Sequence, residues 1–260
     1  MSARLRHDIH GSESAPVLVL APSVGTLPEM WDPQLAAFAR EFRVVRIAHR
    51  GHDEIDVPPG PYSLDDLGGD VLALLDSLGV DRFSWCGLSL GGMVGMWLAA
   101  HAPERVDRLA VCCTSAHLPP AQGWLDRAAK VRASGMSAVA DAVVPRWFTP
   151  EFLAKRPGAV DRCRSMLLSV PAEGYAGCCE AIAAMDLRPL LASIQAPTLV
   201  LAGAQDLPTP LPHAETITSL VPGATLVVVE DAAHLATVQQ PERCTEVLLN
   251  HLLDRPGGAA

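Results

Sequence analysis

The stretch Cys86-Gly87-Leu88-Ser89-Leu90-Gly91-Gly92 decides the fold that we expect for this chain. It contains the pattern G-x-S-x-G, with an apolar run before it (82–86) and a helix-forming run after it (93–100). A strand, a tight turn and a helix in this order form a nucleophile elbow, which exposes a serine hydroxyl at the edge of a sheet. The alternative is a glycine-rich turn with an incidental serine. The flanking runs favour the elbow, so we predict that Ser89 is a nucleophile at a helix N-terminus, where free amides favour a developing anion.

The composition is that of a compact globular chain. It has 260 residues, of which 49% are hydrophobic and 19% charged, which favours one domain with room for an insertion. The net charge of −9 and the absence of a basic patch argue against nucleic-acid binding. No apolar run is long enough to span a membrane, and the first residues lack the apolar segment of a signal peptide. We therefore expect a cytoplasmic protein with neither nucleic-acid nor membrane partners.

The cysteines also indicate a cytoplasmic protein. There are seven, an odd number, and two adjacent pairs occur at Cys112-Cys113 and Cys178-Cys179. Adjacent residues do not easily pair with each other, and no C-x-x-C pair stands at zinc spacing. We expect reduced thiols that act as small hydrophobic residues, and we expect no metal or other cofactor.

Apolar runs alternate with helical patterns through most of the chain. The predicted buried strands are 16–22, 42–47, 82–86, 106–113, 197–203 and 224–229, with a possible edge strand at 4–10. Helices are predicted at 31–41, 63–78, 90–101 and 241–253, and a frayed tail at 255–260. Ser63 and Asp66 open the second helix as a capping box, and Gly79 ends it. This alternation predicts an α/β fold with a mostly parallel sheet and helices on both faces.

One region interrupts the alternation. No strand signal occurs between about 117 and 190, where five segments have helical patterns: 124–134, 137–144, 150–155, 160–170 and 173–185. We predict that residues 117–190 form a helical cap inserted into a core made of 1–116 and 191–260.

A serine nucleophile needs a base, and the base needs an orienting carboxylate. In a doubly wound sheet such residues follow the carboxyl ends of strands. Asp206 follows the strand 197–203, and His234 follows the strand 224–229. The order Ser89, Asp206, His234 is that of nucleophile, acid and base in this fold. Asp231 is a rival acid on the loop of His234, and Asp186 and Glu180 are weaker rivals.

The oxyanion hole should consist of two backbone amides. We predict that they are those of Leu90, directly after the nucleophile, and Val24, in the loop after the first buried strand. His49 and His52 follow the next strand and face the same edge. A metal role for them, with Asp53 or Glu54, is a minor alternative because a serine triad needs no metal.

The cap offers candidates for substrate binding. Arg132, Arg146 and Arg164 are cations, and a guanidinium suits the carboxylate of an anionic substrate. Trp124 and Trp147 are candidates for lining the pocket, although packing inside the cap is the commoner role of such side chains.

These features resemble the α/β-hydrolase superfamily and, more narrowly, the 3-oxoadipate enol-lactonases. The resemblance covers nearly the whole chain. It rests on Ser23-Val24-Gly25-Thr26, Met30-Trp31-Asp32-Pro33-Gln34, the elbow, and the cap segments 142–149 and 173–182. One loop, 47–56, departs from the family pattern of an aspartate followed by x-Arg-Gly-His-Gly-x-Ser. The family has aspartate at the position of Ala48, the second glycine of this pattern at the position of Asp53, and serine at the position of Ile55.

The resemblance implies a reaction without a cofactor. Ser89 would open an enol-lactone that carries a carboxylate, through an acyl-enzyme, and the enol that is released would become 3-oxoadipate. Arg146 would bind the carboxylate. The alternatives are a carboxylesterase or C–C bond hydrolase with the same triad, and a non-hydrolytic ligand-binding relative. The sequence does not fix the oligomeric state.

Overall fold

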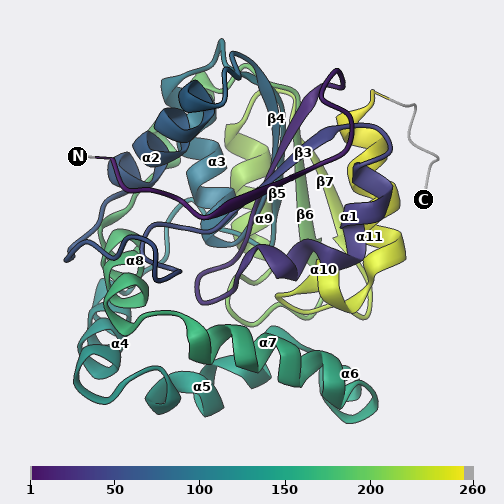
Figure 1. Cartoon of the computed structure of the whole chain (residues 1–260). Coiled ribbons are helices and arrows are strands. Elements are labelled where there is room, and N and C mark those ends of the chain that lie inside the picture. The colour runs from purple at the N-terminus through teal and green to yellow at the C-terminus, as the bar shows by residue number, and fades with distance from the viewer. Residues whose placement is uncertain (1, 255–260) are drawn as a thin grey trace.

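The computed structural model describes residues 2–254, and their centre is a seven-stranded sheet with the order β1-β3-β2-β4-β5-β6-β7 (Figure 1). Only β1 is antiparallel, and it pairs with β3 at one edge. The strands are β1 (His7–His10), β2 (Val17–Ala21), β3 (Arg43–Ile47), β4 (Phe83–Leu88), β5 (Val106–Cys112), β6 (Thr198–Gly203) and β7 (Thr225–Val229). Every residue of β4 and β6 is buried, as expected for strands covered on both faces.

Helices cover both faces of the sheet (Figure 1). One face carries α1 (Asp32–Phe38) and α11 (Pro241–Leu252), and the other carries α2 (Leu64–Ser77), α3 (Leu90–His101) and α9 (Leu211–Leu220). The predicted capping box is present, because the Ser63 hydroxyl accepts from the Asp66 amide and the Asp66 carboxylate accepts from the Ser63 amide. The predicted α/β architecture is confirmed.

The strand order brings two functional loops together. After β3 the chain crosses over β2 to form β4, so β2 and β4 are neighbours although they are not consecutive. The loops that leave the carboxyl ends of these two strands therefore lie side by side. Such a switch point is where ligands bind in open α/β sheets.

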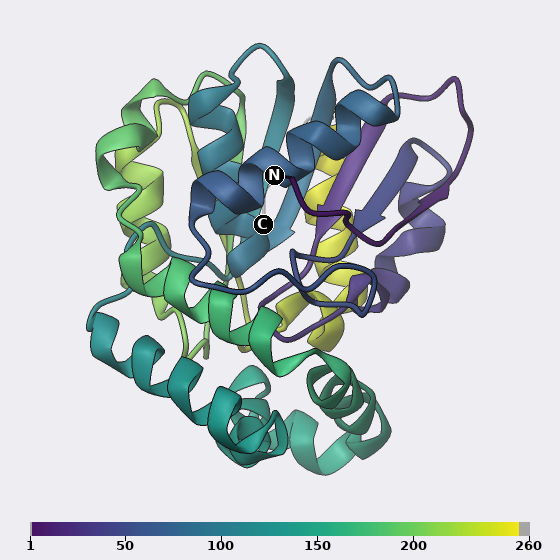
Figure 2. The same ribbon diagram turned by 60° about the vertical axis from the view of Figure 1, so that its left-hand side comes forward.

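Five helices between β5 and β6 lie together on one side of the sheet, below it in Figures 1 and 2. They are α4 (Ala121–Ser134), α5 (Ser137–Val143), α6 (Pro150–Lys155), α7 (Pro157–Ser169) and α8 (Ala172–Ala184), with a 3₁₀ turn η2 (Val144–Trp147) after α5. They match the five helical segments predicted from the sequence. We continue to propose residues 117–190 as a cap over a core of 1–116 and 191–260.

Some elements differ from the prediction. Helix α9 was not predicted, because prolines stand at its start and only Ala214 and Ile217 are buried, which leaves little apolar periodicity. The short elements η1 (Pro28–Trp31), η3 (Arg188–Ser193) and α10 (Ala236–Gln239) were also not predicted. The tail at 255–260 lies outside the described residues. Within residues 2–254, no helix is both long and apolar enough to cross a membrane.

Candidate active site

Ser89 lies at a sharp turn between β4 and α3. Its backbone has φ 55° and ψ −112°, a conformation that non-glycine residues rarely adopt. Two bonds hold it there: the Ser89 amide donates to the Cys112 carbonyl over 2.9 Å, and the Thr114 hydroxyl donates to the Ser89 carbonyl over 2.7 Å. Strain maintained in this way is common where a side chain must be aimed at a ligand.

The glycines of the motif are explained by close packing. A Cβ atom on Gly87 would lie 2.2 Å from the Gly91 carbonyl oxygen, and one on Gly91 would lie 2.4 Å from the Ala21 carbonyl oxygen. Both distances are far below a van der Waals contact with backbone. The first and last positions of G-x-S-x-G therefore allow α3 to start directly against β2 and β4.

Asp206 and His234 meet although they lie on different loops. His234 Nδ1 is 3.0 and 3.1 Å from the two carboxylate oxygens of Asp206, and both side chains are buried. Thr209 donates to the same carboxylate twice, from its amide over 2.9 Å and from its hydroxyl over 2.7 Å. Burial alone would raise the pKa of Asp206, but the facing imidazole and the Thr209 donors hold it below its ordinary value. The group is therefore a carboxylate.

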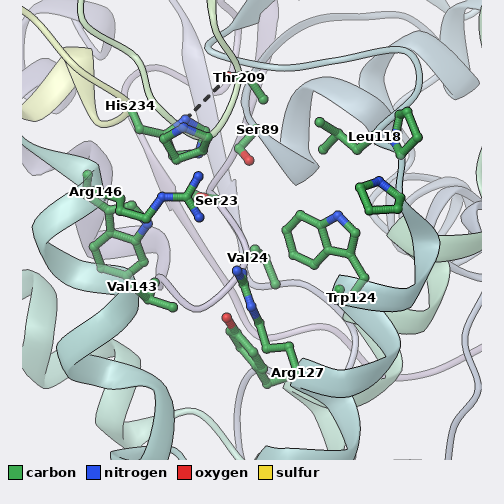
Figure 3. Close-up of a pocket in the computed structure, with 16 residues that line it drawn as sticks. Ser23, Val24, Ser89, Leu118, Trp124, Arg127, Val143, Arg146, Thr209 and His234 are labelled. Atoms are coloured by element: carbon green, nitrogen blue, oxygen red, sulfur yellow. Dashed lines mark hydrogen bonds between the residues drawn. The ribbon is translucent and has the colours of Figure 1, made fainter.

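Ser89 and His234 line the same cavity, which has a volume of about 260 Å³ (Figure 3). The 3₁₀ turn η2 contributes directly to the position of His234, since the amide of the next residue, Leu235, donates to the carbonyl of Trp147 over 3.0 Å. The other lining residues come from both the core and the helices α4–α8: Ser23, Val24, Leu118, Pro119, Pro120, Gly123, Trp124, Arg127, Val143, Arg146, Trp147, Tyr175, Pro208 and Thr209.

The loop after β2 forms a tight turn over residues 23–26. The Thr26 amide donates to the Ser23 carbonyl over 3.1 Å, and Gly25 has φ +77°. Within the described residues neither the Val24 amide nor the Leu90 amide has an acceptor. Both amides belong to the loops that the switch point brings together, so both are available to a ligand beside Ser89.

Two guanidinium groups enter this cavity. Figure 3 shows Arg127 and Arg146 extending from different helical segments into the space in front of Ser89 and His234. Arg127 is half-buried, with its guanidinium carbon 4.5 Å from the centre of the Trp124 ring. Arg146 is exposed and donates to the Leu207 carbonyl over 3.3 Å. Among residues 2–254, neither forms an ion pair with a carboxylate.

The other two arginines considered from the sequence are engaged elsewhere. Arg132 pairs with Glu173 and Glu180, and Arg164 pairs with Asp141. Trp124 and Trp147 both line the cavity. Arg127 was not among the cations identified from the sequence, because its place in the cavity depends on how α4 packs against α8.

The rival acids are also engaged elsewhere. Asp231 adopts φ 53° and contributes its carbonyl to a bond with Gln239 over 2.9 Å. Asp186 pairs with Arg188, and Glu180 with Arg132. Of the acidic residues considered, Asp206 is the one whose carboxylate contacts His234.

The loop 47–56 adopts a conformation that suits its unusual residues. Asp53, at a position where the family has glycine, accepts from the Ile55 amide over 2.7 Å and from the Arg6 amide over 3.2 Å. Its carboxylate therefore stabilises the loop. In the part of the chain that the structure describes, no group of three or more histidine, cysteine or acidic side chains could hold a metal ion.

A sheet of this order, a serine at a strand–turn–helix elbow and a buried histidine–carboxylate pair are together typical of the α/β hydrolases. Residues 16–241 match the alpha/beta hydrolase fold family, and the chain belongs to it. It is 41% identical to 3-oxoadipate enol-lactonase 2 of Acinetobacter baylyi, over 92% of this chain and 89% of that protein. It is similar to the crystal structure of the enol-lactonase from Burkholderia xenovorans LB400, with 39% identity, a TM-score of 0.94 and coverage of 96% and 97%. A hydrolase from Pseudomonas aeruginosa PA01 has 45% identity, a TM-score of 0.93 and coverage of 96% and 94%.

Proposed function

We propose that this protein is a serine hydrolase that opens a carboxylate-bearing enol-lactone, 3-oxoadipate enol-lactone, to give 3-oxoadipate. One observation carries the proposal. A single cavity of about 260 Å³ holds Ser89, His234 and two guanidinium groups that have no carboxylate partner within residues 2–254. A nucleophile and base beside unpaired cations suit an anionic ester. Enol-lactonases are among the relatives at 36–41% identity, which supports the same substrate class.

In the first half of the reaction Ser89 Oγ attacks the ring carbonyl carbon while His234 takes the hydroxyl proton. The carbonyl oxygen becomes an oxyanion, which the amides of Val24 and Leu90 bind. Collapse of this intermediate breaks the ring C–O bond. The enol oxygen leaves with the proton from His234, and the acyl group stays on Ser89. An enolate is a stabilised leaving group, so this step needs little further assistance.

In the second half water enters beside the acyl group, to which the enol remains joined through the opened ring. His234 takes a proton from the water, the resulting hydroxide attacks the acyl carbon, and the second oxyanion uses the same two amides. Collapse returns the proton to Ser89 and releases a dicarboxylate, whose enol tautomerises to the ketone. Asp206 orients His234 and stabilises the imidazolium in both halves.

The substrate carboxylate is assigned to the arginines. A guanidinium forms two parallel bonds with a carboxylate, and such charge-assisted bonds are stronger than neutral ones. Arg127 is the better placed of the two, since it is half-buried and stacked on Trp124, which holds its guanidinium in one orientation. The cavity is slightly smaller than the roughly 300–1,000 Å³ typical for drug-sized ligands, which suits a small metabolite.

Rates on three substrates test the proposal: the enol-lactone, p-nitrophenyl acetate and a vinylogous dienoate. We expect kcat/KM to be highest for the enol-lactone. A preference for p-nitrophenyl acetate would indicate a general carboxylesterase, and turnover of the dienoate alone would indicate a C–C bond hydrolase. No turnover together with no labelling of Ser89 by a fluorophosphonate would indicate a ligand-binding relative.

The assignment of the carboxylate makes a prediction for Arg127→Met. Loss of a charge-assisted bond costs about 1.5–3 kcal/mol, so KM for the enol-lactone should rise about 10- to 100-fold while kcat changes less. The matched variant Arg146→Met should raise KM by a smaller factor, because Arg146 is exposed and its interaction is screened by water.

Turnover of neutral p-nitrophenyl acetate is the control and should change little in either variant. The assignment would be reversed if Arg146→Met had the larger effect, and it would be wrong if neither variant changed KM for the lactone.

We also propose a cytoplasmic location. All seven cysteines are buried and free, as expected for a chain that folds in a reducing compartment.

A further inference from the structure

Two buried histidines hold the loop that carries the Val24 amide, one near each end. We propose that His52, assisted by His49, is a positioning residue that fixes the oxyanion-hole loop 22–25 in the conformation needed for the reaction. The inference rests on the proposed function, because it is the serine hydrolase mechanism that gives Val24 its role. Neither histidine lines the cavity, so both act through the loop.

The contacts at the two ends of the loop are short. The Gly25 amide donates to Nε2 of His52 over 3.0 Å. At the other end, Nε2 of His49 lies 2.7 Å from the Pro22 carbonyl oxygen. The same carbonyl accepts from the Gly91 amide over 3.1 Å, which ties the loop to the elbow. Val24 lies between these fixed points.

The two rings must carry their protons on different nitrogens. Because the Gly25 N–H is a donor, Nε2 of His52 must be unprotonated, and its proton belongs on Nδ1, which faces the Arg50 carbonyl at 3.4 Å. Because the Pro22 carbonyl is an acceptor, Nε2 of His49 must carry a proton. The bond to Gly25 therefore requires a neutral His52, and the low pKa of the buried His49 makes that ring neutral as well. Burial lowers the pKa of His49 to about 4, and burial together with the neighbouring His49 lowers the pKa of His52 to about 3.

The bond to Gly25 restrains the part of the turn that is easiest to move. With φ +77° at Gly25, the turn over residues 23–26 fits type II, whose central peptide joins Val24 to Gly25. Rotation of that peptide would convert the turn to another type, and a turn free to change type would no longer hold the adjoining Val24 amide in one place. His52 holds the N–H of this central peptide, so it opposes the rotation.

The cap encloses the histidine loop. Gly174 of α8 packs directly on Gly51, since a Cβ atom there would lie 1.8 Å from the Gly51 carbonyl oxygen. The Cys178 sulfur lies 3.9 Å from Nδ1 of His52. With His52 only 1% exposed, water does not compete for the Gly25 amide. Such a bond fixes geometry better than one on the surface.

The test compares His52→Leu with His52→Gln. Leucine fills the space but accepts no hydrogen bond, whereas the side-chain carbonyl of glutamine reaches the position of Nε2 and accepts one. We expect His52→Leu to lower kcat for the enol-lactone about 10- to 100-fold with KM within about threefold, because the oxyanion exists only after substrate is bound. His52→Gln should restore kcat to within about fivefold of the original protein.

A second readout is affinity for a boronic acid, which forms a tetrahedral adduct with Ser89, against affinity for 3-oxoadipate. His52→Leu should lower the affinity for the boronic acid by the same factor as kcat and leave the affinity for 3-oxoadipate unchanged. Equal kcat in His52→Leu and the original protein would overturn the proposal. Equal losses in the leucine and glutamine variants would also overturn it, because they would show a packing role.

Labelling of Ser89 by a fluorophosphonate separates this inference from the proposed function. Its rate depends on the oxyanion hole but not on the natural substrate. If the protein does not hydrolyse the lactone, slower labelling in His52→Leu with recovery in His52→Gln would still support the positioning role. If His52→Leu does not fold, His52→Asn serves instead, since its shorter amide cannot reach Gly25. Unchanged labelling in a folded leucine or asparagine variant would overturn the inference.

Discussion

Replacement of Ser89 by alanine should abolish hydrolysis of the enol-lactone. Without the hydroxyl no acyl-enzyme forms, and the remaining oxyanion-hole amides and binding groups can only assist direct attack by water. We expect kcat to fall about 10⁴-fold or more, while binding of 3-oxoadipate remains within about twofold. Single-turnover kinetics with the enol-lactone and calorimetric titration with the product measure the two effects.

Ser89→Gly is the matched variant. It also lacks the nucleophile, but glycine adopts φ 55° without the strain that serine and alanine share at this position. We expect Ser89→Gly to be as inactive as Ser89→Ala and to have a free energy of unfolding about 1 kcal/mol higher. Substantial turnover in either variant would show that Ser89 is not the nucleophile. A lower stability of the glycine variant would show that the elbow is not strained.

The elbow could be predicted from sequence because its determinants are local. The helix predicted at 90–101 has the same bounds as α3, and its start follows from G-x-S-x-G; strand β4 runs to Leu88, two residues beyond the predicted end. The loops carrying Asp206 and His234 were identifiable for a similar reason. Each follows a continuous apolar run, and the carboxyl ends of parallel strands meet at one edge of the sheet.

Contacts between distant segments could not be predicted in this way. The bond between Gly25 and His52 joins two loops whose distance depends on the pairing of β2 and β3. Arg127 faces the cavity because α4 packs against α8, and no local pattern gives that orientation. The sequence shows that Asp53 departs from the family pattern, but only the structure shows that its carboxylate accepts hydrogen bonds from the Ile55 and Arg6 amides.

Asp206→Asn should have an effect almost as large as loss of the nucleophile. The Thr209 amide donates to one oxygen of Asp206, so asparagine must place its carbonyl oxygen there and its NH₂ at the other position. That position lies 3.0 Å from Nδ1 of His234 and the carbonyl position 3.1 Å, so the NH₂ group becomes the nearer neighbour of Nδ1. An NH₂ group donates to Nδ1, so the imidazole proton lies on Nε2. A protonated Nε2 cannot accept the proton of Ser89. We expect kcat to fall about 10⁴-fold with little change in KM.

Two variants control for this interpretation. Asp231→Asn should keep kcat within about twofold, because the contact of Asp231 near the site uses its backbone carbonyl, which the substitution preserves. Thr209→Val keeps the amide but loses the hydroxyl that donates to Asp206, and we expect a drop in kcat of about 10-fold, from one lost hydrogen bond to a charged group. A large loss in Asp231→Asn with little change in Asp206→Asn would assign the orienting carboxylate to Asp231. That result would require the loop of His234 to rearrange when substrate binds, since in the present geometry it is Asp206 that contacts the imidazole.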